Sequence, residues 1–175
     1  KIAKEYNIEL IPNIQFPEFT FDISPEKAYE IARIRGKKFA LKNSKYFKII
    51  EIGNENNLKI RTNNKKVNGK YPYDSQKEKV LISYLKGFED GIKDSKVGWK
   101  IIISSADDDD YFFSLLKKNN VYLDYIGSTK YGYSDDYEKT LKKYYSIYKK
   151  PIWILEFNYP SGSLNVSKIN QKYWL

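Results

Sequence analysis

Five apolar runs of strand length recur along this chain, and a helix-like segment separates each run from the next. The runs cover residues 8–16, 46–53, 99–105, 123–131 and 152–157. Most are apolar at successive positions rather than at every second one, which is typical of strands buried on both faces. Strands of this kind that alternate with helices predict an α/β fold with a parallel sheet, either doubly wound or part of a (β/α)8 barrel.

The segments between the runs carry helix signals. Helices are expected over 26–43, 75–94, 109–119 and 134–150, with shorter helical stretches at 1–9 and 166–175, and a long polar loop over 56–74. Ser24, Pro25 and Glu26 form the start signal of the first long helix. Two helices show an apolar stripe that predicts a buried face. The stripes are Ala28, Ile31, Ala32 and Ile34 in the first, and Val80, Leu81, Tyr84, Leu85 and Phe88 in the second.

The absence of two residue types narrows the chemistry of the chain. It has no Cys, which excludes disulfides, thiol nucleophiles and zinc-finger sites, and no His, which removes the commonest general base. Acid–base chemistry must therefore fall to carboxylates, Lys or Tyr, and we expect neither a cofactor nor a metal. No Gly-rich phosphate loop follows any predicted strand, which disfavours a nucleotide-binding doubly wound sheet.

The chain carries a formal net charge of +9, which raises the question of a polyanionic partner. Its lysines are spread through nearly every segment and are mixed with Asp and Glu, so we expect no nucleic-acid partner. A basic α/β module that binds polyanions remains a minor alternative. No stretch of about 20 apolar residues exists, so no membrane-spanning segment is expected. The sequence makes no prediction of compartment or oligomeric state.

Polar residues gather where the predicted strands end. In a parallel α/β sheet, the C-terminal strand ends and their loops line the functional site. The second strand ends in Asn54-Glu55, the third in Ser104-Ser105, the fourth in Ser128-Thr129 and Tyr131, and the fifth in Glu156 before Asn158. Two carboxylates that face one cleft suit glycoside hydrolysis, since one can protonate the leaving oxygen while the other attacks the anomeric carbon.

Three segments resemble those of clan A glycoside hydrolases, the retaining (β/α)8 enzymes. "KIIEIGNEN" (48–56) resembles the Asn-Glu motif that ends their fourth strand, and "KPIWILEFNYPSG" (150–162) resembles their seventh-strand segment. "LDYIGSTKYGY" (123–133) is similar to their sixth-strand segment. The resemblance implies that residues 1–175 form a single, incomplete catalytic barrel covering about strands three to seven. Because the chain begins with Lys in a helix-like stretch, we expect it to be a fragment.

The resemblance also implies a role for individual residues. Glu55 becomes the acid/base, Asn54 its neighbour that binds the sugar 2-hydroxyl, and Glu156 the nucleophile that Tyr131 contacts. Substrate-binding positions follow for Gln15, Thr129 and Asn158. Thr129 and Gln15 stand where many clan members carry His, and a small hydroxyl residue at the former position is similar to the endo-β-1,4-galactanase branch.

The predicted activity is thus retaining hydrolysis of β-glycosidic bonds in a poly- or oligosaccharide. The main alternative is a catalytically inactive relative that binds carbohydrate. Tyr71, Tyr73 and Tyr133 in the loops are expected either to stack on sugars or to pack the loops. The acid run 107–110 is interpreted as the acidic first turn of a helix rather than a cation site.

Overall fold

A computed structural model describes residues 2–15, 21–131 and 137–158, so the helix expected over 166–175 and Tyr133 lie outside the described residues. Five parallel strands form one sheet in the order β1-β2-β3-β4-β5, which is also their order in the sequence. The strands are β1 (Asn13–Ile14), β2 (Ile49–Ile52), β3 (Lys100–Ala106), β4 (Tyr125–Tyr131) and β5 (Ile152–Asn158). Parallel strands in sequence order, joined through helices, form part of the wall of an α/β barrel.

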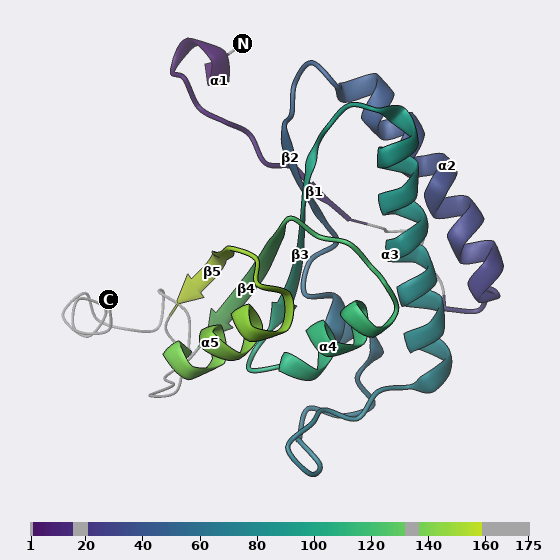
Figure 1. The fold of residues 1–175 in the computed structure, drawn as a ribbon, viewed down its shortest axis with the longest axis vertical. Coiled ribbons are helices and arrows are strands. Elements are labelled where there is room, and N and C mark those ends of the chain that lie inside the picture. Colours follow the sequence, from purple (N-terminus) through teal and green to yellow (C-terminus); the bar gives the residue numbers. More distant parts are fainter. Residues whose placement is uncertain (1, 16–20, 132–136, 159–175) are drawn as a thin grey trace.

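The predicted long helices are all present. They are α2 (Pro25–Asn43), α3 (Ser75–Ser95), α4 (Asp110–Lys118) and α5 (Tyr137–Tyr148), preceded by the short α1 (Ile2–Glu5). In Figure 1, α2 and α3 lie side by side on the right, and α4 and α5 lie next to each other at the bottom of the view. The short α1 stands apart from the sheet. The region expected to be a loop begins with η1 (Asn56–Ile60), a 3-10 helix that the sequence did not predict.

The prediction of a strand over 8–16 is wrong for most of its length, because only Asn13 and Ile14 pair with β2. Ile8 and Leu10 are half exposed instead. β1 is the first strand of the sheet and pairs only with β2 among the described residues. An apolar run becomes a strand only where a neighbour accepts its backbone hydrogen bonds. By the register of β1, residues 8–10 would lie opposite residues 46–48, before β2 begins at Ile49.

One face of the sheet forms the hydrophobic core with the helices. Alternate residues of β2, β3 and β4 point to this outer face and are almost fully buried: Ile50, Ile52, Ile101, Ile103 and Ile126. The predicted stripe of α3 is buried against the same core. Since side chains alternate between faces, the remaining residues of each strand point to the inner face of the barrel wall.

Small residues let α2 and α3 pack closely. The buried residues of α2 are Ala28, Ala32, Gly36 and Ala40, spaced four apart, so including Ile34 in the buried stripe was wrong. Ile34 is 56% exposed. A Cβ added to Gly36 would lie 2.4 Å from the Phe88 carbonyl oxygen of α3. Close backbone contact therefore selects the row of small residues and turns the larger Ile34 outward.

Candidate active site

Polar side chains collect on the inner face of the sheet towards its C-terminal edge. In the strand pairing, Asn13 lies opposite Glu51 and Thr129 lies opposite Glu156. Paired residues of neighbouring strands share a face, so each pair points the same way. Ser104 of β3 belongs to this face as well, because Glu51 pairs with Ile102, two residues before it. Apolar strands thus present a polar inner surface.

The segment "GNEN" after β2 turns the chain sharply. Gly53 has φ +71°, and Glu55 takes the left-handed conformation with φ 46° and ψ 49°. Asn56 closes the turn by donating a hydrogen bond from Nδ2 to the carbonyl oxygen of Ile52, 2.9 Å away. A Cβ on Gly53 would lie only 2.2 Å from Oδ1 of Asn56. Left-handed backbone is unfavourable for a non-glycine residue, so Glu55 is held there by its surroundings.

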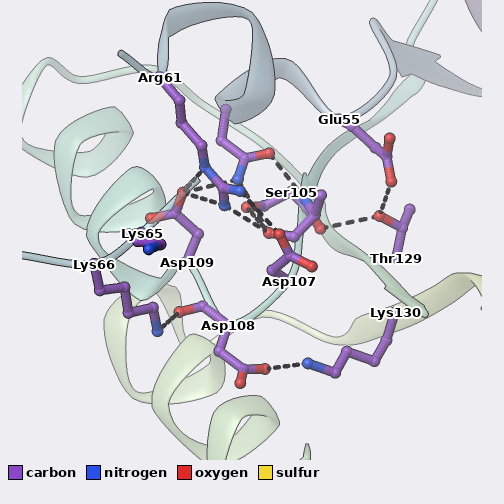
Figure 2. Close-up of polar contacts among 12 residues, drawn as sticks. Glu55, Arg61, Lys65, Lys66, Ser105, Asp107, Asp108, Asp109, Thr129 and Lys130 are labelled. Atoms are coloured by element: carbon purple, nitrogen blue, oxygen red, sulfur yellow. Dashed lines mark hydrogen bonds and ion pairs between the residues drawn. The ribbon is translucent and has the colours of Figure 1, made fainter. Parts of the chain in front are cut away.

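Two neighbouring strands hold Glu55 directly. Its backbone N–H donates to Oγ of Ser104 on β3 at 3.1 Å. Its carboxylate oxygen Oε1 accepts a hydrogen bond from Oγ1 of Thr129 on β4 at 2.6 Å, as Figure 2 shows. Asn54, immediately before it, is half-buried. The structure therefore brings together two residues predicted for the site, Glu55 and Thr129.

The turn that follows Glu55 is anchored to the end of β3. The Asn57 side-chain amide donates to the carbonyl oxygen of Ala106 at 3.0 Å, and its Oδ1 accepts from the Ala106 N–H at 2.9 Å. The same amide donates to Oδ2 of Asp109 at 2.8 Å. Because Asn57 is fully buried, these bonds are shielded from water and tie η1 to the loop after β3.

A buried ion pair completes this anchor (Figure 2). Arg61 donates to Asp109 at 2.9 Å and to Asp107 at 2.8 Å, and the Arg61 and Asp109 side chains are 2% and 1% exposed. Burial works against the charge of Arg61, but the hydrogen bonds to Asp107 and Asp109 outweigh it and raise the pKa of the guanidinium. The interpretation of the acid run as the first turn of a helix is confirmed for Asp110 in α4, whereas Asp109 is the N-cap residue and makes no side-chain cap, because its carboxylate binds Arg61.

Two loop tyrosines belong to the same anchor. Arg61 stacks over the ring of Tyr71 at 3.4 Å, and the Tyr73 hydroxyl donates to Asp109 at 2.8 Å. Burial and the neighbouring Asp109 carboxylate raise the pKa of Tyr73 well above its usual range. Both rings therefore have roles in packing the loop, the alternative to sugar stacking that the sequence left open.

Glu156 reaches the inner face because β5 contains a bulge. Ser128 pairs with Ile154, but the next residue, Thr129, pairs with Glu156, so Leu155 is an extra residue. Without this irregularity, strand alternation would place Leu155 opposite Thr129. The bulge thus re-aims one side chain at the strand end and places Glu156 beside the threonine that contacts Glu55.

The remaining predicted site residues are placed less completely. Tyr131 and Asn158 pair with each other at the ends of β4 and β5, and their side chains lie outside the described part of the structure. Gln15 follows β1, is exposed, and lines a groove of about 340 Å³ with Arg35 and Phe39 of α2. The roles of these three residues stay predictions.

Glu51 is a further site residue that the sequence interpretation missed. It is 7% exposed, and Asn13 donates a hydrogen bond from Nδ2 to its Oε2 at 2.5 Å. Burial raises the pKa of Glu51; Ser104 and Asn13 oppose this, and the charges of Glu156 and Glu55 add to it. The signal was present in the sequence, since an acid interrupts the apolar strand "KIIEI" at an inner-face position.

Two other features of the described residues bear on function. No group of three or more acidic side chains is arranged there to hold a metal ion. In the same part of the chain, none of the helices has the length and apolar character needed to cross a membrane.

Comparison with known proteins identifies the fold. No protein-family model and no curated protein matches the sequence. Among solved structures, the chain is similar to an endo-1,4-beta-xylanase from Caldicellulosiruptor owensensis, with a TM-score of 0.62 and 18% identity over 90% of this chain and 53% of that one. It is also similar to the Ignisphaera aggregans GH53 catalytic domain, with a TM-score of 0.56 and 17% identity over 86% and 46%.

A GH10 xylanase from Bispora. sp MEY-1, solved with xylobiose, gives a TM-score of 0.56 and 12% identity over 86% of this chain and 50% of that one. This chain therefore spans about half the length of each of these structures. The likeness shows the fold, a partial α/β barrel, which confirms the predicted fold class.

Proposed function

We propose that this chain is the central part of a single glycoside hydrolase catalytic barrel that cleaves β-glycosidic bonds with retention of configuration. The observation that carries the proposal is the link between two strand ends: Thr129 donates to Glu55 and pairs in the sheet with Glu156. Two carboxylates on one wall of a barrel, at the edge where such folds carry their sites, are the minimal machinery for this reaction.

In the first step, a carboxylate oxygen of Glu156 attacks the anomeric carbon of the sugar. The bond between that carbon and the glycosidic oxygen breaks, and Glu55 gives its proton to the departing oxygen. The products are a glycosyl ester on Glu156 and a free alcohol, while Glu55 is left as a carboxylate.

In the second step, Glu55 takes a proton from a water molecule, which attacks the same carbon from the face that the alcohol left. The ester bond to Glu156 breaks, and the carboxylate of Glu156 is restored. Two inversions give net retention. Thr129 keeps the Glu55 carboxyl oriented throughout, because its hydroxyl donates to Oε1.

The substrate we propose is a β-1,4-linked polysaccharide. Support comes from the printed names of the structural neighbours, two of which are xylanases and one of which was solved with xylobiose. The small hydroxyl residue Thr129, similar to the endo-β-1,4-galactanase branch, favours a galactanase-like preference. Asn54, Gln15, Tyr131 and Asn158 are the proposed sugar-binding residues.

The test is hydrolysis of β-1,4-xylan and β-1,4-galactan by the full chain, measured as the release of reducing ends. Glu55→Gln and Glu156→Gln should each lower the rate by roughly 10² to 10⁴-fold, while Glu30→Gln on the exposed face of α2 should leave it unchanged. In Glu156→Ala, sodium azide should restore cleavage of an activated aryl glycoside, because azide can replace the missing nucleophile.

Other outcomes would select the rival functions. Saturable binding of these glycans without cleavage would indicate an inactive carbohydrate-binding barrel. Binding that ignores sugar identity and weakens steeply with salt would indicate the polyanion-binding module instead.

A further inference from the structure

Glu51 is the most buried carboxyl group on the inner face, and the two-step reaction does not use it. It lies on β2, four residues before Glu55 and so deeper in the barrel wall. Its Oε2 accepts the hydrogen bond from Asn13, whereas its Oε1 is buried and has no hydrogen bond of ordinary geometry. The Ser104 hydroxyl lies outside that geometry but near enough to favour the charged form. An unpartnered buried polar atom is costly, so its presence in a polar site calls for a physical reason.

The groups around Glu51 come from three other strands of the sheet and from the turn after β2. β1 contributes Asn13, β3 contributes the hydroxyl of Ser104, and the charged neighbours are Glu55 after β2 and Glu156 on β5. Both charged neighbours are acids. A negative charge on Glu51 would be buried and would be repelled by whichever of these two acids is ionised.

Two features of Glu51 are unfavourable for a carboxylate, namely the unpartnered Oε1 and the burial of a charge beside two other acids. A neutral carboxylic acid removes both. Protonation removes the buried charge and the repulsion, and it turns the unpartnered Oε1 into a hydrogen-bond donor. Burial, with the charges of Glu156 and Glu55 adding to it, shifts the pKa of Glu51 upward, in the direction that protonation requires.

We propose that Glu51 is a positioning residue that works as a neutral acid, held at Oε2 by Asn13 and offering a donor at Oε1 to the carboxylates and water of the site. This inference rests on the proposed glycosidase function for its catalytic consequence. The neutral acid leaves the negative charge of the site to Glu156 before the first step and to Glu55 after it, as the two-step reaction requires.

Two substitutions of similar size separate a neutral donor from a charged group. Glu51→Gln keeps the shape, accepts from Asn13 and still donates, so kcat should stay within about twofold of the wild type. Glu51→Met removes the donor, and kcat should fall about tenfold with little change in KM. If Glu51→Gln is as damaging as Glu51→Met, the group acts through its charge and the inference is overturned.

A titration provides a readout that does not depend on activity. The side-chain carboxyl carbon of Glu51, followed by ¹³C NMR, should change shift at a pH above the ordinary range for glutamate, about 4.3. The signal assignment comes from its absence in Glu51→Gln. Titration in the range of ordinary exposed glutamates would overturn the inference.

The pH dependence of stability gives an independent check. A carboxyl whose folded pKa is raised contributes stability below its unfolded pKa, and that contribution is lost as pH rises through the folded value. Glu51→Gln should therefore raise the melting temperature more at pH 7 than at pH 4. The exposed replacement Glu30→Gln should show no such difference.

The two proposals fail in different ways. A chain that cleaves no glycoside but shows a high-titrating Glu51 would refute the proposed function and keep the neutral acid. An active chain whose Glu51 titrates in the ordinary range, or whose Glu51→Gln variant loses activity like Glu51→Met, would refute this inference alone.

Discussion

The two candidate catalytic glutamates are positioned in different ways. Glu55 follows a strand with a neighbour on each side, and its backbone, its carboxylate and the turn after it are all bonded to β3, β4 or the loop beyond β3. Glu156 lies on β5, which pairs only with β4 among the described residues, and a bulge sets its direction. The position of the proposed acid/base is therefore determined by several elements, whereas the strand that carries the proposed nucleophile has one paired neighbour among the described residues.

This comparison predicts that substitutions around Glu55 cost more than those around Glu156. The largest effect is expected at Asp109, because Asp109→Asn leaves the buried Arg61 guanidinium without one of its two carboxylates. We expect the free energy of unfolding in urea to fall by about 3–5 kcal/mol. Asp94→Asn breaks an exposed pair with Arg33 at 2.8 Å, close to the 2.9 Å of the Arg61–Asp109 pair, and should cost less than about 1 kcal/mol. Equal losses of unfolding free energy in the two variants would contradict the view that burial makes the Arg61–Asp109 pair the more costly one to break.

Gly53→Ala should have the second-largest effect. The substitution forces a side chain into left-handed backbone and into the space of Asn56, so we expect a loss of roughly 2–4 kcal/mol. Gly69→Ala is the matched control, since Gly69 has φ +78° but nothing within 4 Å of an added Cβ. It should cost only about 1 kcal/mol in the same urea titration. Similar costs for both would mean that Asn56 simply moves aside.

Gly127→Ala tests the Glu156 side of the comparison. An added Cβ would lie 2.8 Å from the Leu155 side chain at the bulge and 2.8 Å from Cβ of Ser104. The end of the Leu155 side chain can shift, whereas Cβ of Ser104 is fixed to β3, so we expect a loss of about 1–3 kcal/mol. This is less than for Gly53→Ala, because Gly127 is not in left-handed backbone. A loss larger than that of Gly53→Ala would reverse the proposed order of rigidity.

Thr129→Val should have the smallest effect on stability, about 1 kcal/mol, because it removes one hydrogen bond with little change in volume. It should still lower glycoside hydrolysis by roughly tenfold, since Glu55 loses the donor that orients Oε1. Thr140→Val on α5 replaces another buried threonine and should leave hydrolysis unchanged. Loss of activity in both variants would point to a general packing effect.

The sequence predicted the elements well where periodicity and start signals agreed, as in α2, which begins at Pro25 after its Ser24 cap. It failed where the outcome depended on neighbours in space. The strand expected over 8–16 lacks a partner for most of its length, and Ile34 is displaced by close contact between two helices. Neither the spacing of residues nor their type records such contacts.

The candidate site likewise contains residues with a local sequence signal and features that only contacts in space determine. Glu55 and Glu156 stood out because each acid ends an apolar strand. Thr129 was noted as a polar strand end, and its role in binding substrate came from a family resemblance. The bulge at Leu155 depends on how β5 pairs with β4, and the Arg61–Asp109 pair joins residues far apart in the sequence. No local pattern could therefore predict either feature. The sequence shows Glu51 as an acid in an apolar strand, but a role in the site follows only from its burial near two other acids in the structure.

The central claim is that Glu55 and Glu156 form one retaining pair, and the configuration of the first sugar released tests it most directly. The full chain is mixed with a β-linked oligosaccharide in an NMR tube, and the anomeric proton of the new reducing end is followed before mutarotation. The account predicts that the β-anomer appears first, because two displacements restore the configuration. Initial release of the α-anomer would contradict it, since a single displacement by water leaves no role for Glu156 as nucleophile.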